Sequence, residues 1–188
     1  MARGSIHVTN PAGQGPAGIQ GPTGATGATG PAAPTPKYGA FEYTGRQAIT
    51  NAALEYTFPW NTTDFSSDIT TSNTTRINFP TAGTYNIQWS GQFQNTSNVA
   101  KDIYVWLAIN GTAVPGSTGV ATIPGSHGGS NGHNIVGWNY YLTFTAGQYL
   151  EIKWGAETTD VSLESYVAGT SPTRPTTAAL ILTAQQIA

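Results

Sequence analysis

The two imidazoles that lie closest together in the sequence belong to His127 and His133, which bound a glycine-rich segment, HGGSNGH. Two histidines on one loop, with Asn131 between them, could hold a metal ion or a small ligand. A metal or catalytic centre usually needs three converging ligands or an acid–base pair, but this segment contains no acidic residue. We therefore interpret it as a candidate ligand-binding loop without a metal, whose histidines order the loop or contact a neighbouring subunit.

Residues for catalysis are not grouped elsewhere in the sequence. The nine Asp and Glu residues are scattered singly, whereas a glycosidase needs two carboxylates that face each other across a sugar. The absence of cysteine excludes thiolate nucleophiles, thiolate metal sites and disulfides. We expect a protein that is not an enzyme and that carries no cofactor.

Aromatic side chains are the other residue type that could recognise a ligand, because their flat rings stack on sugars. The chain has five tryptophans and nine tyrosines, and most of the tryptophans lie in or beside predicted strands. Packing in the core or at a subunit contact is the default for such residues. Trp60 lies in a loop, FPWN, and is the tryptophan that we expect to be exposed. A host surface glycan is therefore a candidate partner, contacted by Trp60 or by the loop that contains His127.

Composition excludes two classes of partner. Only 9% of the residues are charged and the formal net charge is -2, so there is no basic patch that could gather phosphates. The N-terminal residues show no apolar run that resembles a signal peptide, and no stretch of about eighteen apolar residues occurs. We expect neither nucleic acid nor membrane insertion. A neutral polar surface is typical of an extracellular or virion protein.

Strands are the elements that must position these residues. Apolar and polar residues alternate between residues 85 and 94, as in a half-buried strand. Residues 102–109 have large apolar groups on both faces, so we expect one face to pack in a sandwich and the other against a subunit. The hairpin signal Asn110-Gly111, further glycine-rich turns and the lack of helical periodicity predict an all-β antiparallel sandwich or barrel. Further strands are predicted near residues 39–44, 54–58, 75–79, 134–144, 150–154, 160–167 and 177–186.

A glycine occupies every third position from residue 15 to residue 32, which gives six Gly-X-Y triplets. Only glycine fits where three polyproline-like strands crowd one axis, so the repeat predicts a short collagen-like triple helix and hence a homotrimer. Because the repeat is short and poor in proline, another part of the chain must hold the trimer together. A flexible linker is the alternative. The glycines expected at the triple-helix axis are Gly15, Gly18, Gly21, Gly24, Gly27 and Gly30.

The repeat divides the chain into four predicted parts. Residues 1–14 form a leader that anchors the protein in a larger assembly, with Ile6 and Val8 as the apolar anchors. Residues 15–32 form the rod. Residues 33–37 form a proline-rich neck, which cannot be helical. Residues 38–188 are long enough for one globular head with a single core.

Three stretches of the head resemble the trimeric jelly-roll family of complement-type globular heads and tumour-necrosis-factor-like proteins. They are residues 76–85 (RINFPTAGTY), 106–114 (WLAINGTAV) and 141–152 (YLTFTAGQYLEI). The resemblance spans most of residues 38–188 and implies an antiparallel jelly-roll sandwich that forms a homotrimer. The chain differs from animal members of that family in having no signal peptide and in its last strand, residues 178–186 (AALILTAQQ).

Three further segments resemble small tailed-phage structural proteins that carry collagen-like repeats: residues 127–133 (HGGSNGH), 136–141 (VGWNYY) and 170–175 (TSPTRP). This resemblance implies a virion component. We expect a capsid decoration or head-fibre trimer on the virion surface, bound through its leader to the major capsid protein or another virion protein. One alternative is a receptor-binding tail fibre or tail-tip adhesin that recognises host polysaccharide. Another is a secreted bacterial or animal collagen-like adhesion protein.

Overall fold

The structure is a computed structural model that describes residue 4 and residues 18–28, 30 and 35–188. The chain divides after Pro34 into two units, Met1–Pro34 and Thr35–Ala188. The predicted anchors Ile6 and Val8, and the first glycine of the repeat, Gly15, lie outside the described residues.

The described part of the glycine repeat, residues 18–28 and 30, is exposed and forms neither helix nor strand. Nothing lies within 4 Å of the position that a Cβ atom would take on any of its described glycines, which are Gly18, Gly21, Gly24, Gly27 and Gly30. A single chain therefore gives no steric reason for glycine at every third position. The triple helix stays a prediction, and only further chains could supply the crowding that requires these glycines.

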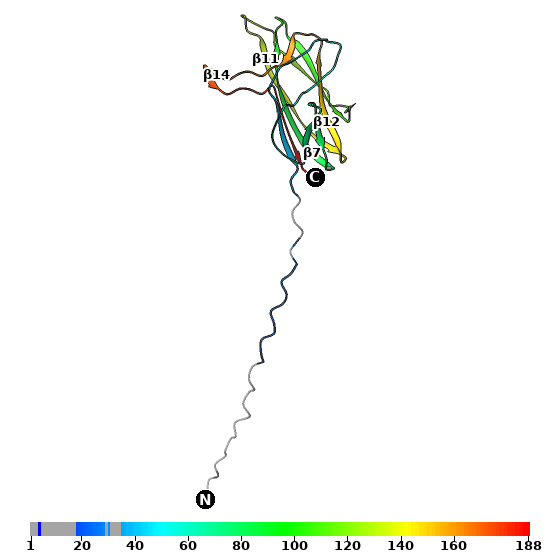
Figure 1. Ribbon diagram of the computed structural model, residues 1–188, viewed down its shortest axis with the longest axis vertical. Helices are drawn as coiled ribbons and strands as arrows, with labels where there is room; N and C mark the ends of the chain where they lie inside the picture. The colour runs from blue at the N-terminus through cyan, green and yellow to red at the C-terminus, as the bar shows by residue number, and fades with distance from the viewer. Residues whose placement is uncertain (1–3, 5–17, 29, 31–34) are drawn as a thin grey trace. The chain divides into compact units, whose positions relative to one another are not determined.

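The second unit is all-β, as predicted, and the described residues contain no helix, hence none that could cross a membrane. Two antiparallel sheets form a sandwich (Figure 1). Sheet A contains β1 (Tyr38–Tyr43), β2 (Gln47–Ala48), β4 (Thr62–Ser67), β7 (Gly83–Asn95), β11 (Gly132–Phe144), β13 (Val161–Leu163) and β16 (Leu180–Gln186). Sheet B contains β3 (Tyr56–Thr57), β5 (Thr70–Ser72), β6 (Arg76–Phe79), β8 (Lys101–Ile109), β9 (Thr112–Ala113), β10 (Gly119–Ile123) and β12 (Gln148–Ala156). A separate pair, β14 (Gly169–Thr170) and β15 (Thr173–Arg174), forms an arm that projects from the sandwich.

Sheet A is built around β7, one of its two longest strands. β11 pairs with β7 along its whole length, from Phe144 opposite Gly83 to Gly132 opposite Asn95. On its other side β7 pairs with β16 and then, near its end, with β13. β1 pairs with β16, and β4 pairs with β1. Since β7 is the only strand that pairs with β11 among the described residues, β11 is an edge strand thirteen residues long.

Sheet B has the strand order β10, β8, β12, β6, β5, with β9 paired to β8 and β3 paired to β12. The chain passes repeatedly from one sheet to the other, because β6 in sheet B leads to β7 in sheet A, and β10 leads to β11 in the same way. Strands that are neighbours in sequence are therefore seldom neighbours in a sheet. This connectivity joins the two sheets into one body with a shared core.

Aromatic rings from both sheets fill the core between them. Phe79 of β6 stacks on Phe144 of β11 with ring centroids 3.9 Å apart. Phe93 of β7 lies edge-on to Trp154 of β12, with centroids 5.4 Å apart. Phe58, which follows β3, contacts this pair and is fully buried. Every second residue of β7 is buried, which is why the sequence shows the alternation that predicts a strand there.

Predicted and observed strands agree best where the strand has one apolar face. The Asn110-Gly111 hairpin joins β8 to β9, and both residues have positive φ angles, 51° and 78°, as a tight hairpin turn requires. Seven strands lie outside the predicted ranges: β2, β4, β5, β9, β10, β14 and β15. The predicted strand at 160–167 is shorter, because β13 ends at Leu163. Of the two architectures left open by the sequence, the sandwich is observed.

Asn95 ties together the loops at one end of the sandwich. Its side chain is fully buried, and its Nδ2 lies 2.9 Å from the carbonyl oxygen of Val99, 3.1 Å from that of Pro124 and 3.3 Å from that of Ile123. Its Oδ1 accepts a hydrogen bond from the backbone N–H of Ser97 at 2.9 Å. One amide thus joins the turn after β7 to the start of the glycine-rich segment.

Candidate functional site

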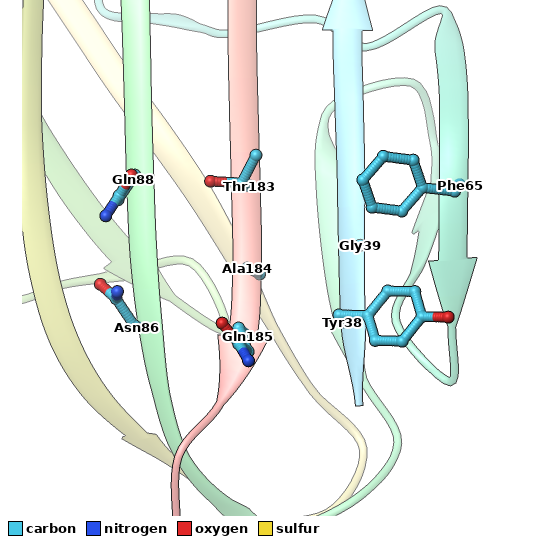
Figure 2. Close-up of a pocket in the computed structure, with 8 residues that line it drawn as sticks. All are labelled: Tyr38, Gly39, Phe65, Asn86, Gln88, Thr183, Ala184 and Gln185. Carbon is cyan, nitrogen blue, oxygen red and sulfur yellow. The ribbon is translucent and has the colours of Figure 1, made fainter. Parts of the chain in front are cut away.

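A groove of about 490 Å³ lies on the outer face of sheet A. Its lining residues come from β7, β16, β1 and β4, which are neighbours in sheet A (Figure 2). The residues that line it are Asn86 and Gln88 of β7, Thr183, Ala184 and Gln185 of β16, Tyr38 and Gly39 of β1, and Phe65 of β4. The Tyr38 and Phe65 rings meet edge to face with centroids 5.9 Å apart. The groove thus combines side-chain amides and a hydroxyl on one side with two aromatic rings on the other.

Strand alternation positions these side chains. In β7 the odd-numbered residues from Tyr85 to Asn95 are buried in the core, so the even-numbered residues point to the outer face. In β16, Leu180, Leu182 and Ala184 are buried and the residues between them are exposed. If the pairing register of either strand slipped by one residue, its core side chains would turn outward and its amides inward. Burial of the apolar side chains therefore fixes which amides reach the groove.

The outer face of sheet A, defined here by the outward side chains of β7, β11 and β16, carries almost no charge. None of the residues in these three strands is Asp, Glu, Lys or Arg, and His133 and Tyr141 are the ionisable residues among their outward side chains. Large apolar groups stand exposed on this face: Ile135 is 68% exposed, Tyr141 is 65% exposed and Ile181 is 42% exposed. Such a surface is suited to contact another uncharged surface, since it holds no ion that contact would strip of water.

One polar atom beside the groove lacks a partner. The Oδ1 atom of Asn86 is buried, yet no group in the described part of the chain donates a hydrogen bond to it. A buried acceptor without a donor costs about 1–3 kcal/mol, so a donor from a ligand or another chain would stabilise this site. The groove has no acid–base pair among its lining residues, and the described residues contain no group of three His, Cys, Asp or Glu side chains that could hold a metal. The groups that it does offer, which are side-chain amides, a hydroxyl and two aromatic rings, are ones that could bind a ligand.

The glycine-rich loop is a tight turn. His127 and Ser130 exchange both backbone hydrogen bonds, at 2.9 and 3.0 Å, while Gly128 and Gly129 between them have φ angles of 61° and 81°. Asn131 is exposed beside this turn. Residues 128–132 also fit the Gly-x-Ser-x-Gly pattern of hydrolase nucleophiles, but that motif requires a strand-to-helix turn. Here Ser130 closes a hairpin, so the loop lacks the geometry of a nucleophile.

His127 and His133, the predicted pair, make different contacts. The Nδ1 atom of His133 lies 3.0 Å from the hydroxyl of Tyr166, whose side chain also contacts Gln94 at 3.2 Å. Burial, together with the negative charge of Glu164, raises the pKa of Tyr166, so this phenol stays protonated. His133 therefore connects β11 to the segment that leads into the arm, whereas His127 belongs to the hairpin turn.

The expectation that Trp60 is exposed is wrong. Its side chain is 3% exposed and packs edge-on against Phe58, with ring centroids 6.4 Å apart. The loop FPWN inserts both rings into the core, where Phe58 also packs edge-on against Trp89 of β7 with ring centroids 5.2 Å apart. Trp60 is therefore no part of a ligand-binding surface with the loop at His127.

The groove residues Tyr38, Phe65 and Asn86 were missed by sequence reasoning. The three residues come from strands that are distant in sequence, and β4 is polar enough that it was not predicted as a strand at all. One signal was available: the absence of charge from residues 83–95, 132–144 and 180–186. No protein-family model and no curated protein matches this chain.

Proposed function

We propose that this chain is a non-enzymatic virion structural protein that works as a homotrimer, in which a jelly-roll head stands on a collagen-like triple helix. In this proposal the trimer decorates the capsid or forms a head fibre at the virion surface. The observation that carries the proposal is the uncharged outer face of sheet A, with Ile135, Tyr141 and Ile181 exposed on it, in a chain that also has six Gly-X-Y triplets.

The strand pairing supports a jelly roll. The eight main strands in chain order are β1, β6, β7, β8, β10, β11, β12 and β16. In this order the first pairs with the eighth, the second with the seventh, the third with the sixth and the fourth with the fifth. A chain folded double and then rolled up gives this nested pairing, with its halves on two sheets, as in jelly rolls. The resemblance of residues 76–85, 106–114 and 141–152 to trimeric jelly rolls agrees with it.

The edge of sheet A supports self-association. β11 is long and has no Asp, Glu, Lys, Arg or Pro, and among the strands that the structure describes it pairs with β7 alone. A monomer with such an edge would be prone to aggregate, and proteins usually protect long edges with charges, bulges or a covering element. A second copy that covers β11 and the adjoining outer face would protect this edge and bury Ile135 and Tyr141.

The position of Tyr38 supports a threefold arrangement. Tyr38 begins β1, lines the groove on the outer face of sheet A, and is the point from which the chain leads back to the neck. Three heads that pack through this face bring their three Tyr38 residues near one axis. A triple helix requires its three chains to lie side by side around one axis, so this arrangement would suit the glycine repeat.

The virion role rests on the resemblance of residues 127–133, 136–141 and 170–175 to phage structural proteins, and attachment is proposed through the leader. Light scattering of the purified chain should give three times the chain mass of 19.6 kDa. Quantitative mass spectrometry of purified particles should then find many copies per particle. A monomer in solution would refute the trimer, and a chain absent from particles would refute the virion role.

A receptor-binding tail fibre or tail-tip adhesin is the second candidate function. It is favoured by a cleft on sheet B that exposes the aromatic side chains of Tyr104 and Trp106. A tail protein is present in few copies per particle, so the same mass spectrometry separates the two candidates. In both of them a host surface polysaccharide is a partner that the head could contact.

A further inference from the structure

A cleft of about 450 Å³ lies on the outer face of sheet B, away from the outer face of sheet A. It is bounded by β8, by the end of β12 and by the loop between β2 and β3. Its lining residues are Ala52, Ala53, Leu54, Glu55, Tyr104, Trp106, Gly155, Ala156 and Glu157. Aromatic rings, carboxylates and an exposed leucine thus meet in one concave site.

Two aromatic side chains form the floor. In β8, Ile103, Val105 and Leu107 are buried in the core, so Tyr104 and Trp106 point to the opposite face and stand half-exposed. Alternate residues of one strand lie about 7 Å apart, which sets the two side chains side by side. Two neighbouring flat rings offer a platform about as long as one pyranose ring. The C–H groups on the less polar face of a sugar can stack on such a platform.

Gly155 keeps the space above the floor open. It lies directly opposite Tyr104 in the sheet. A Cβ atom at this position would meet only the carbonyl oxygen of Leu54, at 3.6 Å, an ordinary contact distance, and Gly155 has no positive φ angle. The backbone would therefore accept a Cβ atom here, and the missing side chain leaves room for a ligand. Glycine inside a strand often marks such a close approach.

Hydrogen-bonding groups line the rim. The hydroxyl of Tyr104 donates to Oε1 of Glu157 at 3.0 Å, and this contact raises the pKa of Tyr104. Glu55 also lines the cleft, from the loop between β2 and β3, with its Oε1 3.5 Å from Nζ of Lys153. Each carboxylate has further lone pairs for hydroxyl donors. A carboxylate can accept hydrogen bonds from two hydroxyl groups of one sugar ring, whereas its charge repels an anionic ligand.

The rim is held in place before any ligand binds. The hydroxyl of Tyr56 accepts hydrogen bonds from the backbone N–H groups of Thr50 and Asn51, at 2.9 and 2.8 Å. The side chain of Asn51 accepts another from the N–H of Ala53 at 2.9 Å. The loop that carries Leu54 and Glu55 is thus ordered by its own contacts. A site that is already ordered loses less entropy on binding.

We propose that this cleft binds one uncharged pyranose unit of a glycan, stacked on Tyr104 and Trp106 and hydrogen-bonded to Glu55 and Glu157. The sequence indicated a subunit contact for the second face of residues 102–109. The carboxylates at the rim and the space left by Gly155 favour a sugar instead. An aromatic cage for a quaternary ammonium needs rings on several sides, and this cleft has rings on its floor only.

The site deepens the second candidate function and rests on it for its biological role, but it does not depend on the trimer. The outer face of sheet B lies apart from the face proposed for self-association, so each chain of a trimer would display one cleft outward. Weak binding at three clefts would add up on a polymeric glycan.

Saturation-transfer NMR on the full chain tests the site. The probes are methyl glucoside, methyl galactoside, methyl mannoside and N-acetylglucosamine, with glucuronic acid as an anionic counterpart, each at about 10 mM, because dissociation constants on the order of 1 mM are expected for one ring in a shallow cleft. At least one neutral sugar should receive saturation on its ring C–H protons, and glucuronic acid should not. Gly155→Leu and Trp106→Ala should weaken binding about tenfold or more.

Tyr149→Ala is the matched control, because Tyr149 lies outside the cleft near the other end of β12. It should leave sugar binding unchanged. Circular dichroism should show that each variant is folded. If Trp106→Ala does not fold, Gly155→Leu still tests the cleft, because it fills the space above the aromatic side chains. No saturation of any neutral sugar, or full binding by Gly155→Leu, would overturn the proposal. So would a fall of Trp106→Ala to monomer mass, which would assign this face to a subunit contact. Particle copy number tests the function separately.

Discussion

Replacing Asn95 with alanine should lower the stability of the head by about 3 kcal/mol. The two N–H groups of this amide serve three backbone carbonyls, and its oxygen accepts one backbone N–H. Because two N–H groups are shared among three carbonyls, the four contacts amount to about three hydrogen bonds, each worth about 0.5–1.5 kcal/mol net. The substitution also leaves the buried backbone groups that they serve without partners. For a domain of this length, about 3 kcal/mol corresponds to a fall in melting temperature of about 10 °C.

The assay is thermal unfolding followed by circular dichroism, at one fixed protein concentration, because the midpoint of a protein that self-associates depends on concentration. Asn98→Ala is the control, since Asn98 lies in the same turn with its side chain exposed. Asn95→Asp keeps the volume but turns a donor into an acceptor that faces the same carbonyls, so it should be at least as damaging as alanine. A fall of less than about 3 °C for Asn95→Ala would refute the view that this amide holds the loops together.

Three further outcomes are expected. Ile135→Lys places a charge on the outer face of sheet A and should reduce the mass in light scattering to that of one chain; an unchanged trimer would place the contact elsewhere. Gly24→Val should abolish a polyproline-like circular dichroism signal while leaving a protease-resistant head, and an unaltered signal would favour a flexible linker. Stability should fall above about pH 10, because burial raises the pKa of Tyr85, Tyr140 and Tyr166 in the folded chain. The unfolded tyrosines ionise first, so urea midpoints at about pH 8 should exceed those at higher pH, and equal midpoints would contradict this.

Sequence patterns predict the strands whose two faces differ. β7 alternates between buried and outward residues along its length, and β8, β12 and β16 each bury several residues in the core. β4 has the sequence TTDFSS and is exposed along most of its length, so no apolar period could reveal it. It is a strand because its backbone pairs with β1. Backbone pairing of this kind depends on a partner that is distant in sequence.

The candidate sites were harder to predict than the fold, for a similar reason. Trp60 lies in a segment rich in turn residues, yet its ring is buried against Phe58. The cleft on sheet B joins Tyr104 and Gly155, which are far apart in sequence and face each other only through strand pairing. Residues 102–109 did signal a second apolar face. What that face contacts depends on the loop at Leu54, whose position no local pattern specifies.

The lack of charge along β7, β11 and β16 predicts how the proposed trimer should respond to salt. Ionic strength weakens contacts between charges, with a screening length of about 8 Å at physiological salt, but it screens no contact between amides and apolar groups. The stability of an assembly formed through the outer face of sheet A should therefore be nearly the same at low and at high concentrations of sodium chloride. Kosmotropic salts would strengthen it slightly, since they favour the burial of apolar surface.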